Sequence, residues 1–238
     1  MHRFLPIKNN YKKQIQRMSG YVKHTNPRPE LKNRIVKVAH QAFLKNGIKA
    51  ITMDEIAAML GISKRTLYEI FPDKQELLKA CILAGQEVGE AHIREVYAKS
   101  KNVLEVILGV FLYSIGMVHS TNRKFFEEIK KYPEAEELIR KKRNSDSEET
   151  INFFRQGVEQ GVFRSDVNFA IVNQLVKEQI NMLVNSDLCT RFSFLEVYES
   201  IMFTYLRGIA TENGARELEE FIVNYRKNGI ETRQQVFI

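Results

Sequence analysis

The sequence predicts an all-α protein, and three observations support this fold class. Chain breakers are scarce, with 5 Pro and 12 Gly among 238 residues, so long helices can run uninterrupted. Apolar residues recur with the helical period along most of the chain. No stretch keeps the two-residue alternation of a sheet for long enough to matter.

The first 29 residues form a basic leader, which we expect to be disordered. They carry seven Lys or Arg and no Asp or Glu. Residues 30–74 carry a net charge of +3, and residues 75–238 carry −3. This asymmetry points to a polyanionic partner for the N-terminal part of the chain, residues 1–74. The alternative is a tail without a binding role.

Two helices with strong end signals are expected after the leader. The first has an apolar stripe that includes Ile35 and Phe43, and Gly47 ends it. The second is announced by Thr52 and Glu55, whose spacing forms a capping box. It is short and ends at Gly61.

A third helix begins after Ser63 and is stopped by residues 71–73, Phe-Pro-Asp. Two short helices joined by a tight turn with Gly are typical of a helix-turn-helix. The side chains of this third helix that can pack inward are Leu67, Ile70 and Phe71. Those that project outward together are Lys64, Arg65, Tyr68 and Glu69.

The outward set suits a reader of the DNA major groove. Arg or Lys donates to guanine, and the N-terminal end of such a helix points at the DNA. The candidate DNA contacts on this helix are therefore Lys64, Arg65, Thr66 and Tyr68. The alternative is a solvated helix face, with Tyr68 packed on the first helix and Glu69 paired with a lysine.

Two residues outside the third helix are candidate phosphate contacts. Thr52 lies at a helix N-terminus, where free N–H groups attract anions. Lys74 lies in the first turn of the next helix, where a cation suits the helix dipole poorly. A local structural reason for Lys74 is weak, so we favour a phosphate contact.

The rest of the chain is expected to form longer helices. Their approximate ranges are 73–98, 102–120, 122–131, 133–160, 167–185, 193–211 and 215–227. Residues 144–150 are a polar stretch and a weak boundary. We therefore expect three parts: the leader 1–29, a helix-turn-helix DNA-binding domain 30–75, and a helical ligand-binding and dimerisation domain 76–238.

Residues 31–78 resemble the DNA-binding domain of the tetracycline-repressor (TetR) family. The string GISKRTLYEIF followed by PDKQELL is close to the most typical stretch of the family. Other matching positions are Ile35, Ala39, Phe43, Gly47, Thr52, Ile56 and Ala57. The rest of the chain resembles the family in being helical and of suitable length.

The resemblance implies a homodimeric transcriptional repressor that binds a palindromic DNA operator and is released by a small-molecule effector. It implies that helices 167–185 and 193–211 form the dimer interface. The interface stripe on the second of these is Phe194, Tyr198, Ile201, Tyr205 and Ile209. Packing within one chain is the alternative for this stripe.

An effector pocket would lie among aromatic and apolar residues of the middle helices and would suit a hydrophobic or aromatic compound. Its candidate residues are Phe111, Tyr113, Met117, Phe125, Phe126, Phe153 and Phe154. An ordinary core is the alternative for each. A second functional hypothesis is an architectural or division-associated DNA-binding protein on the same fold, which takes no effector.

The leader is longer than is usual in the family. Either Met18 is the true start, or the leader is a basic arm that follows DNA.

The sequence offers little support for other classes of function. No catalytic or nucleotide-binding motif is present, so we expect neither an enzyme nor a cofactor. His92 and His119 lack partners at metal-ligand spacing, and Cys81 and Cys189 are far apart, which suits a reducing cytosol. The most apolar run, residues 106–118, is too short to span a bilayer. A cytoplasmic protein without membrane contact is expected.

Overall fold

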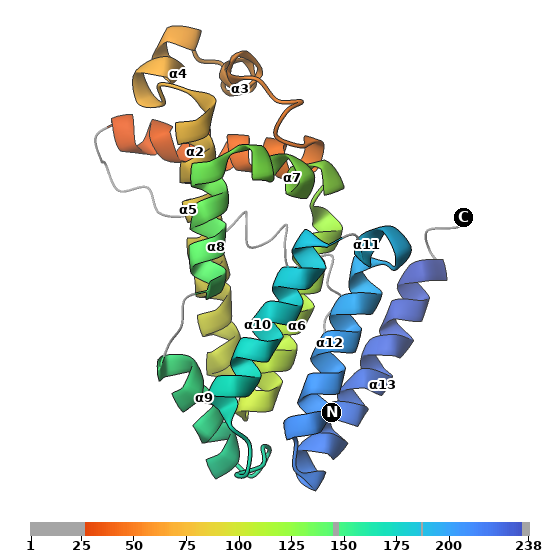
Figure 1. Ribbon diagram of the computed structural model, residues 1–238. Coiled ribbons are helices and arrows are strands. Elements are labelled where there is room, and N and C mark those ends of the chain that lie inside the picture. Colours follow the sequence, from red (N-terminus) through yellow and green to blue (C-terminus); the bar gives the residue numbers. More distant parts are fainter. Residues whose placement is uncertain (1–26, 145–147, 187, 235–238) are drawn as a thin grey trace. The chain divides into compact units, whose positions relative to one another are not determined.

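The computed structural model describes residues 27–144, 148–186 and 188–234 (Figure 1). Over these residues it is helical, with no β-strand and one isolated bridge between Phe163 and Ala210. The all-α prediction is therefore confirmed. The predicted leader lies outside the described residues, except for its last three positions, which begin the first helix.

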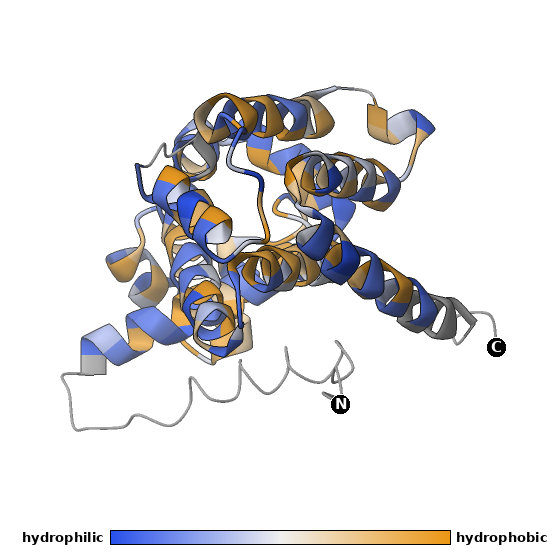
Figure 2. Ribbon diagram, turned by 90° about the horizontal axis from the view of Figure 1, so that it is seen from below, coloured by the Kyte–Doolittle hydropathy of each residue, from blue (hydrophilic) through white to orange (hydrophobic). Residues whose placement is uncertain are grey.

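The helices keep the labels of Figure 1. In chain order they are α2 (Pro27–Asn46), α3 (Met53–Leu60), α4 (Lys64–Ile70), α5 (Lys74–Lys99), α6 (Val103–Ser120), α7 (Arg123–Glu128), the 3-10 turn η1 (Ile129–Lys131), α8 (Pro133–Asn144), α9 (Glu148–Glu159), α10 (Phe169–Asn185), α11 (Leu188–Arg191), α12 (Phe194–Ile209) and α13 (Glu212–Gln234). Most carry both hydrophobic and hydrophilic residues, as amphipathic helices do (Figure 2).

Three helix ranges differ from the sequence prediction. The expected helix 133–160 is described as α8 and α9, with residues 145–147 outside the description. Helix α8 ends and helix α9 begins within the polar stretch 144–150. The last helix starts at Glu212 and is longer than expected, and the short α11 was not predicted.

The chain divides into two compact units. Of the described residues, the first unit contains those up to Ala91 together with Tyr113–Arg140, and the second contains His92–Leu112 and the residues from Lys141 onward. Helices α2, α3, α4 and α7 and most of α8 belong to the first unit, whereas α10, α12 and α13 belong to the second. The three-part division of the sequence stays a prediction.

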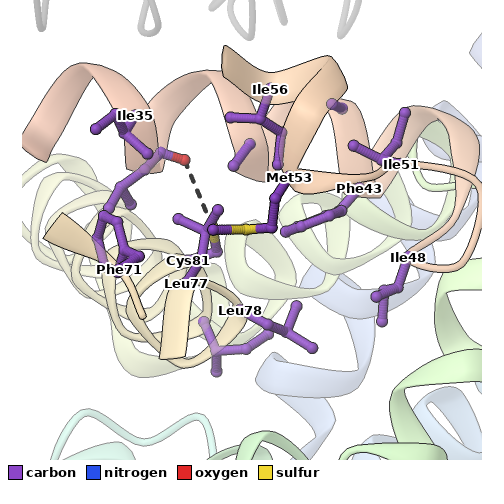
Figure 3. Packing of buried hydrophobic residues seen from close by; sticks show 14 of the residues in the cluster. Ile35, Phe43, Ile48, Ile51, Met53, Ile56, Phe71, Leu77, Leu78 and Cys81 are labelled. Carbon is purple, nitrogen blue, oxygen red and sulfur yellow. Dashed lines mark hydrogen bonds between the residues drawn. The ribbon is translucent and has the colours of Figure 1, made fainter. Parts of the chain in front are cut away.

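The core of the first unit gathers buried side chains from every helix around the helix-turn-helix. Ile35 and Phe43 of α2, Ile56 of α3 and Leu77 of α5 point toward one another (Figure 3). The Cys81 thiol lies among them and donates to the Val36 carbonyl oxygen at 3.5 Å. Burial raises the pKa of this thiol to about 12, so Cys81 is an unreactive core residue.

The predicted helix ends of this unit are present. Thr52 and Glu55 form a complete capping box at α3. Ser63 accepts the Thr66 N–H at the start of α4, and Asp73 accepts the Glu76 N–H at the start of α5. Each cap satisfies an otherwise unpaired N–H, so these short helices begin at defined residues.

The start of α7 is joined to the end of α2 by hydrogen bonds. The Asn122 backbone N–H donates to the Leu44 carbonyl at 2.7 Å, and its side-chain amide donates to the Lys45 carbonyl at 3.1 Å. The Lys49 N–H donates to the Glu128 carboxylate at 2.6 Å. These bonds satisfy carbonyls that the end of a helix leaves free and fix the loop that leads into α3.

The second unit is held by two groups of aromatic rings. Phe111 of α6 packs against Tyr198 and Phe203 of α12 and against Phe221 and Tyr225 of α13. A separate group joins α9 to α10 and α12, and its members are Phe154, Phe163, Phe169 and Tyr205. Rings at these centroid distances stabilise helix packing beyond their buried area.

Helix α6 is the one helix of the described residues that is long and apolar enough to cross a membrane by length and composition. It has 18 residues, because the helix extends beyond the apolar run seen in the sequence. Core helices of soluble proteins meet the same criterion. Val103, Leu104, Leu108 and Phe111 are buried within the protein.

Candidate DNA-binding surface

Helices α3 and α4 form the helix-turn-helix, and Gly61 makes the turn between them. Gly61 has a φ of +66° and its N–H donates back to the Ala57 and Ala58 carbonyls. This left-handed conformation favours glycine and reverses the chain within three residues. Leu67 of α4 is fully buried in the first unit, which sets the face that α4 turns outward.

The outward face of α4 carries the predicted DNA-contacting side chains. The side chains of Lys64 and Arg65 are 67% and 89% exposed, and Tyr68 is 46% exposed. Thr66 is half-buried, and its hydroxyl lies 2.8 Å from that of Ser63. The structure therefore brings Lys64, Arg65 and Tyr68 onto one accessible surface.

Both cations on this surface are paired with carboxylates of the same chain. Lys64 donates to Asp54 of α3, and the Arg65 Nε donates to Glu69 at 2.9 Å. The Asp54 carboxylate raises the pKa of Lys64. A lysine was the alternative partner for Glu69, but the partner is Arg65. The Asp54 partner of Lys64 was not predicted, because ten residues and the turn at Gly61 separate the two.

The Thr52 hydroxyl takes part in the cap of α3. It accepts the Glu55 N–H at 3.2 Å and donates to the Glu55 carboxylate at 2.8 Å. The same carboxylate accepts the Thr52 N–H at 2.7 Å. These bonds lower the pKa of Glu55. They also hold the Glu55 carboxylate beside Thr52, which is the predicted phosphate contact.

Lys74 has a local contact that the sequence did not reveal. Its ammonium lies 5.7 Å from the centre of the Phe43 ring, which is fully buried. The attraction of a cation to a ring face is the physical reason for this placement. Partial burial lowers the pKa of Lys74, whereas Glu128 and Glu55 act on it in the opposite direction.

The predicted pocket residues are divided between the two units. Tyr113, Met117, Phe125 and Phe126 belong to the first, where Phe125 is buried and Phe126 is exposed. Phe111, Phe153 and Phe154 belong to the second. Two shallow hollows of the second unit are lined by other residues, around Val223 and around Arg164. The effector pocket stays a prediction.

The predicted interface stripe of α12 packs largely inside the second unit. Ile209 is buried, the Tyr198 ring stacks on Phe111, and Tyr205 contacts Phe154. Phe194 and Ile201 are half-buried. Three apolar side chains of α10 are exposed, and they are Ile171, Leu175 and Met182. Sequence periodicity marked an apolar face on α12 but not which neighbour covers it.

Comparisons with known proteins point to one class. Residues 35–81 match the family described as "Bacterial regulatory proteins, tetR family". The HTH-type transcriptional repressor KstR2 of Mycobacterium tuberculosis is 24% identical over 157 residues, covering 62% of this chain and 76% of that protein.

Solved structures show the same fold. A TetR-family transcriptional regulator from Marinobacter aquaeolei VT8 aligns with a TM-score of 0.61 at 16% identity, covering 82% of this chain and 98% of its own. A gamma-butyrolactone receptor aligns with a TM-score of 0.54 at 13% identity, covering 84% of this chain and 98% of its own.

A helix-turn-helix with an exposed second helix, joined to a helical C-terminal region, defines a DNA-binding transcriptional regulator. Residues 35–81 match, more particularly, the DNA-binding region of the TetR family, as the sequence indicated.

Proposed function

We propose that this protein is a sequence-specific repressor that binds a palindromic operator as a homodimer and is released by a small-molecule effector. The observation that carries the proposal is the outward face of α4. Arg65 and Tyr68 are accessible there while Leu67 anchors the helix in the core. A short helix held in this way can enter the major groove without rearranging its own domain.

Lys64, Arg65 and Thr66 are assigned to base contacts, because they form the first turn of α4. On binding, a guanine would replace Glu69 as the partner of Arg65. The pair is solvent-exposed, and exposed pairs contribute about 0–1 kcal/mol, so the exchange costs little. Tyr68 is assigned to a phosphate or a thymine methyl group.

Thr52 and Lys74 are assigned to the DNA backbone. Thr52 lies at the start of α3, where the helix dipole attracts a phosphate. The ring of Phe43 holds the Lys74 ammonium in place without neutralising it. Contacts of this kind fix the position of the protein on DNA and carry no sequence information.

We assign the dimer contact to α10. Ile171 and Leu175 are each 58% exposed and Met182 is 51% exposed. Ile171, Leu175 and Met182 recur at helical spacing on one face. A second copy of this chain would bury this face. Two reading heads about 34–36 Å apart then match successive major grooves.

The effector is proposed to be a small hydrophobic or aromatic compound. A gamma-butyrolactone receptor shares the fold, which supports a ligand-binding role for the C-terminal region. The mechanism is a coupling free energy, because effector and operator would prefer different separations of the two heads. The proposed location is the cytoplasm, where the operator DNA lies.

Fluorescence anisotropy with DNA from upstream of the gene, and with scrambled DNA, tests this function. Arg65→Ala should weaken operator binding by about 1–3 kcal/mol and relax the sequence preference. Lys74→Ala should weaken binding to both DNAs equally and lower the salt dependence. Screening compounds in the same assay tests for an effector.

Equal losses on operator and scrambled DNA for Arg65→Ala would overturn the base-reading assignment. Equal, weak binding of the unaltered protein to both DNAs would favour the architectural role. Thermal unfolding of each variant shows whether the fold is intact.

A further inference from the structure

Two lysines of the first unit hold their ammonium groups over aromatic rings. One is Lys74, over Phe43. The other is Lys32 of α2, whose Nζ lies 5.6 Å from the centre of the Phe71 ring. No carboxylate of the described residues pairs with Lys32. A ring holds a cation in place but, unlike a carboxylate, leaves its positive charge uncompensated.

The location of the Phe71 ring relates Lys32 to the recognition helix. Phe71 directly follows α4, and its N–H donates to the Leu67 carbonyl at 2.9 Å. The ring is 4% exposed and belongs to the core of the first unit. Lys32 is exposed on the adjacent face of α2. Its ammonium is therefore held beside the C-terminal end of α4.

The contrast with the cations on α4 itself is informative. Lys64 and Arg65 are already paired with Asp54 and Glu69, so a DNA phosphate would compete with these carboxylates. At Lys32, by contrast, a phosphate would displace no carboxylate of the described residues. One turn earlier on α2, the exposed Arg28 adds a second positive charge.

We propose that Lys32 binds a phosphate of the DNA backbone when α4 lies in the major groove. This proposal rests on the proposed function and adds a backbone contact from α2. It makes Lys32 a source of affinity that is independent of sequence, because a phosphate contact releases a counterion wherever the protein binds.

A purely structural role for Lys32 predicts different behaviour. A cation near the C-terminal end of α4 interacts favourably with the free carbonyls and the helix dipole. In that case the loss of Lys32 lowers the stability of the first unit and leaves the number of phosphate contacts unchanged. The salt dependence of DNA binding separates the two roles.

The experiment compares the full chain with Lys32→Gln, Lys32→Arg and Lys227→Gln. Lys227 is an exposed lysine of α13 in the second unit, so its variant controls for the loss of one charge. Affinity for the upstream DNA and for scrambled DNA is measured by anisotropy across a series of salt concentrations. Thermal unfolding is recorded for every variant.

The expected result is that Lys32→Gln lowers the slope of log affinity against log salt by about 0.9 on both DNAs. Between about 50 and 200 mM salt, one contact changes the affinity about threefold. Lys32→Arg should keep the slope of the unaltered protein, and Lys227→Gln should not change it.

Two results overturn the proposal, and they differ from each other. If the unaltered protein binds and Lys32→Gln keeps its slope, Lys32 is not a phosphate contact and the proposed function stands. A lowered melting temperature with that unchanged slope assigns Lys32 the structural role. If the unaltered protein shows no salt-dependent binding to either DNA, the proposed function fails and the Lys32 contact fails with it.

Discussion

At the level of single residues, the proposed DNA-contacting cations of α4 are paired with carboxylates of the same unit. Asp54 and Glu69 occupy the cations that we assign to base contacts. A non-cognate sequence must displace these partners without offering good hydrogen bonds in return. Under the proposed function, the carboxylates would therefore act against weak, non-specific contacts, which is one source of specificity.

Replacing Asp54 with Asn should strengthen binding to scrambled DNA about 1.4- to fivefold, because the exposed pair with Lys64 is worth about 0.2–1 kcal/mol. Anisotropy at low salt measures this change. Glu212→Gln, which removes an exposed negative charge from the start of α13, serves as the charge control. An increase equal to that of the control would mean that only net charge matters.

His40 of α2 should make the stability of the first unit sensitive to acid. Burial lowers its pKa in the folded state, so the unfolded chain takes up a proton at a higher pH than the folded chain does. The free energy of unfolding should therefore fall as the pH drops below the unfolded-state pKa of about 6.5. Below the folded-state pKa of His40, both states are protonated, and this group causes no further decrease in the free energy of unfolding.

Urea unfolding between about pH 7.5 and 5.5 measures this effect. His40→Gln should flatten the pH dependence, whereas replacement of the exposed His119 of α6 should leave it as it is. A pH dependence that His40→Gln does not reduce would contradict the assignment.

At the scale of elements, local signals predicted most helix starts. The capping box of α3, the N-caps of α4 and α5, and Gly61 involve neighbours within four residues, so the sequence predicts their geometry. The contacts between elements are not predicted by such local signals. Asn122 donates to carbonyls of α2 that lie far away in the chain, and no periodicity reveals such a partner.

The start of α13 makes another such contact. The Thr211 N–H donates to the Val162 carbonyl at 3.1 Å, and the Thr211 hydroxyl donates to the Gly161 carbonyl at 2.7 Å. Gly214 lies next to this contact, where an added Cβ would be 2.1 Å from the Val162 carbonyl oxygen. The Val162 backbone packs so closely against α13 at this position that it leaves no room for a methyl group.

Gly214→Ala should therefore destabilise the protein by about 1–3 kcal/mol, although alanine favours helix. Gly208→Ala is the matched control, because no atom lies within 4 Å of an added Cβ there. It should stabilise by about 0.5–1 kcal/mol through helix propensity. Urea denaturation measures both. Equal effects of the two substitutions would contradict the proposed tight contact.

At the scale of the whole molecule, the oligomeric state decides whether the reading heads act together. We assign the interface to α10, whose exposed apolar side chains include Leu175. Leu175→Glu should give a monomer in sedimentation experiments and weaken operator binding, because one head alone contacts half of a palindrome.

Val223→Glu is the control for this substitution, since Val223 is an exposed apolar residue of α13. A Leu175→Glu protein that remains dimeric would move the interface to another surface. Loss of the dimer in both variants would point to a general effect on the second unit.

Local sequence signals predicted the fold class, the helix-turn-helix and the outward face of α4. Helical periodicity, caps and breakers act over a few residues, so they can be recognised without tertiary structure. The match of residues 35–81 to the TetR family rests on the same local pattern.

The packing of the helices determines which apolar faces are covered and which charges are paired. It packs Tyr198 of α12 on Phe111 and leaves Ile171, Leu175 and Met182 of α10 exposed. It also pairs Lys64 with Asp54 and sets Lys32 over Phe71. These contacts join residues from different helices, and their partners depend on how the helices pack, which the spacing of residues along one helix does not contain.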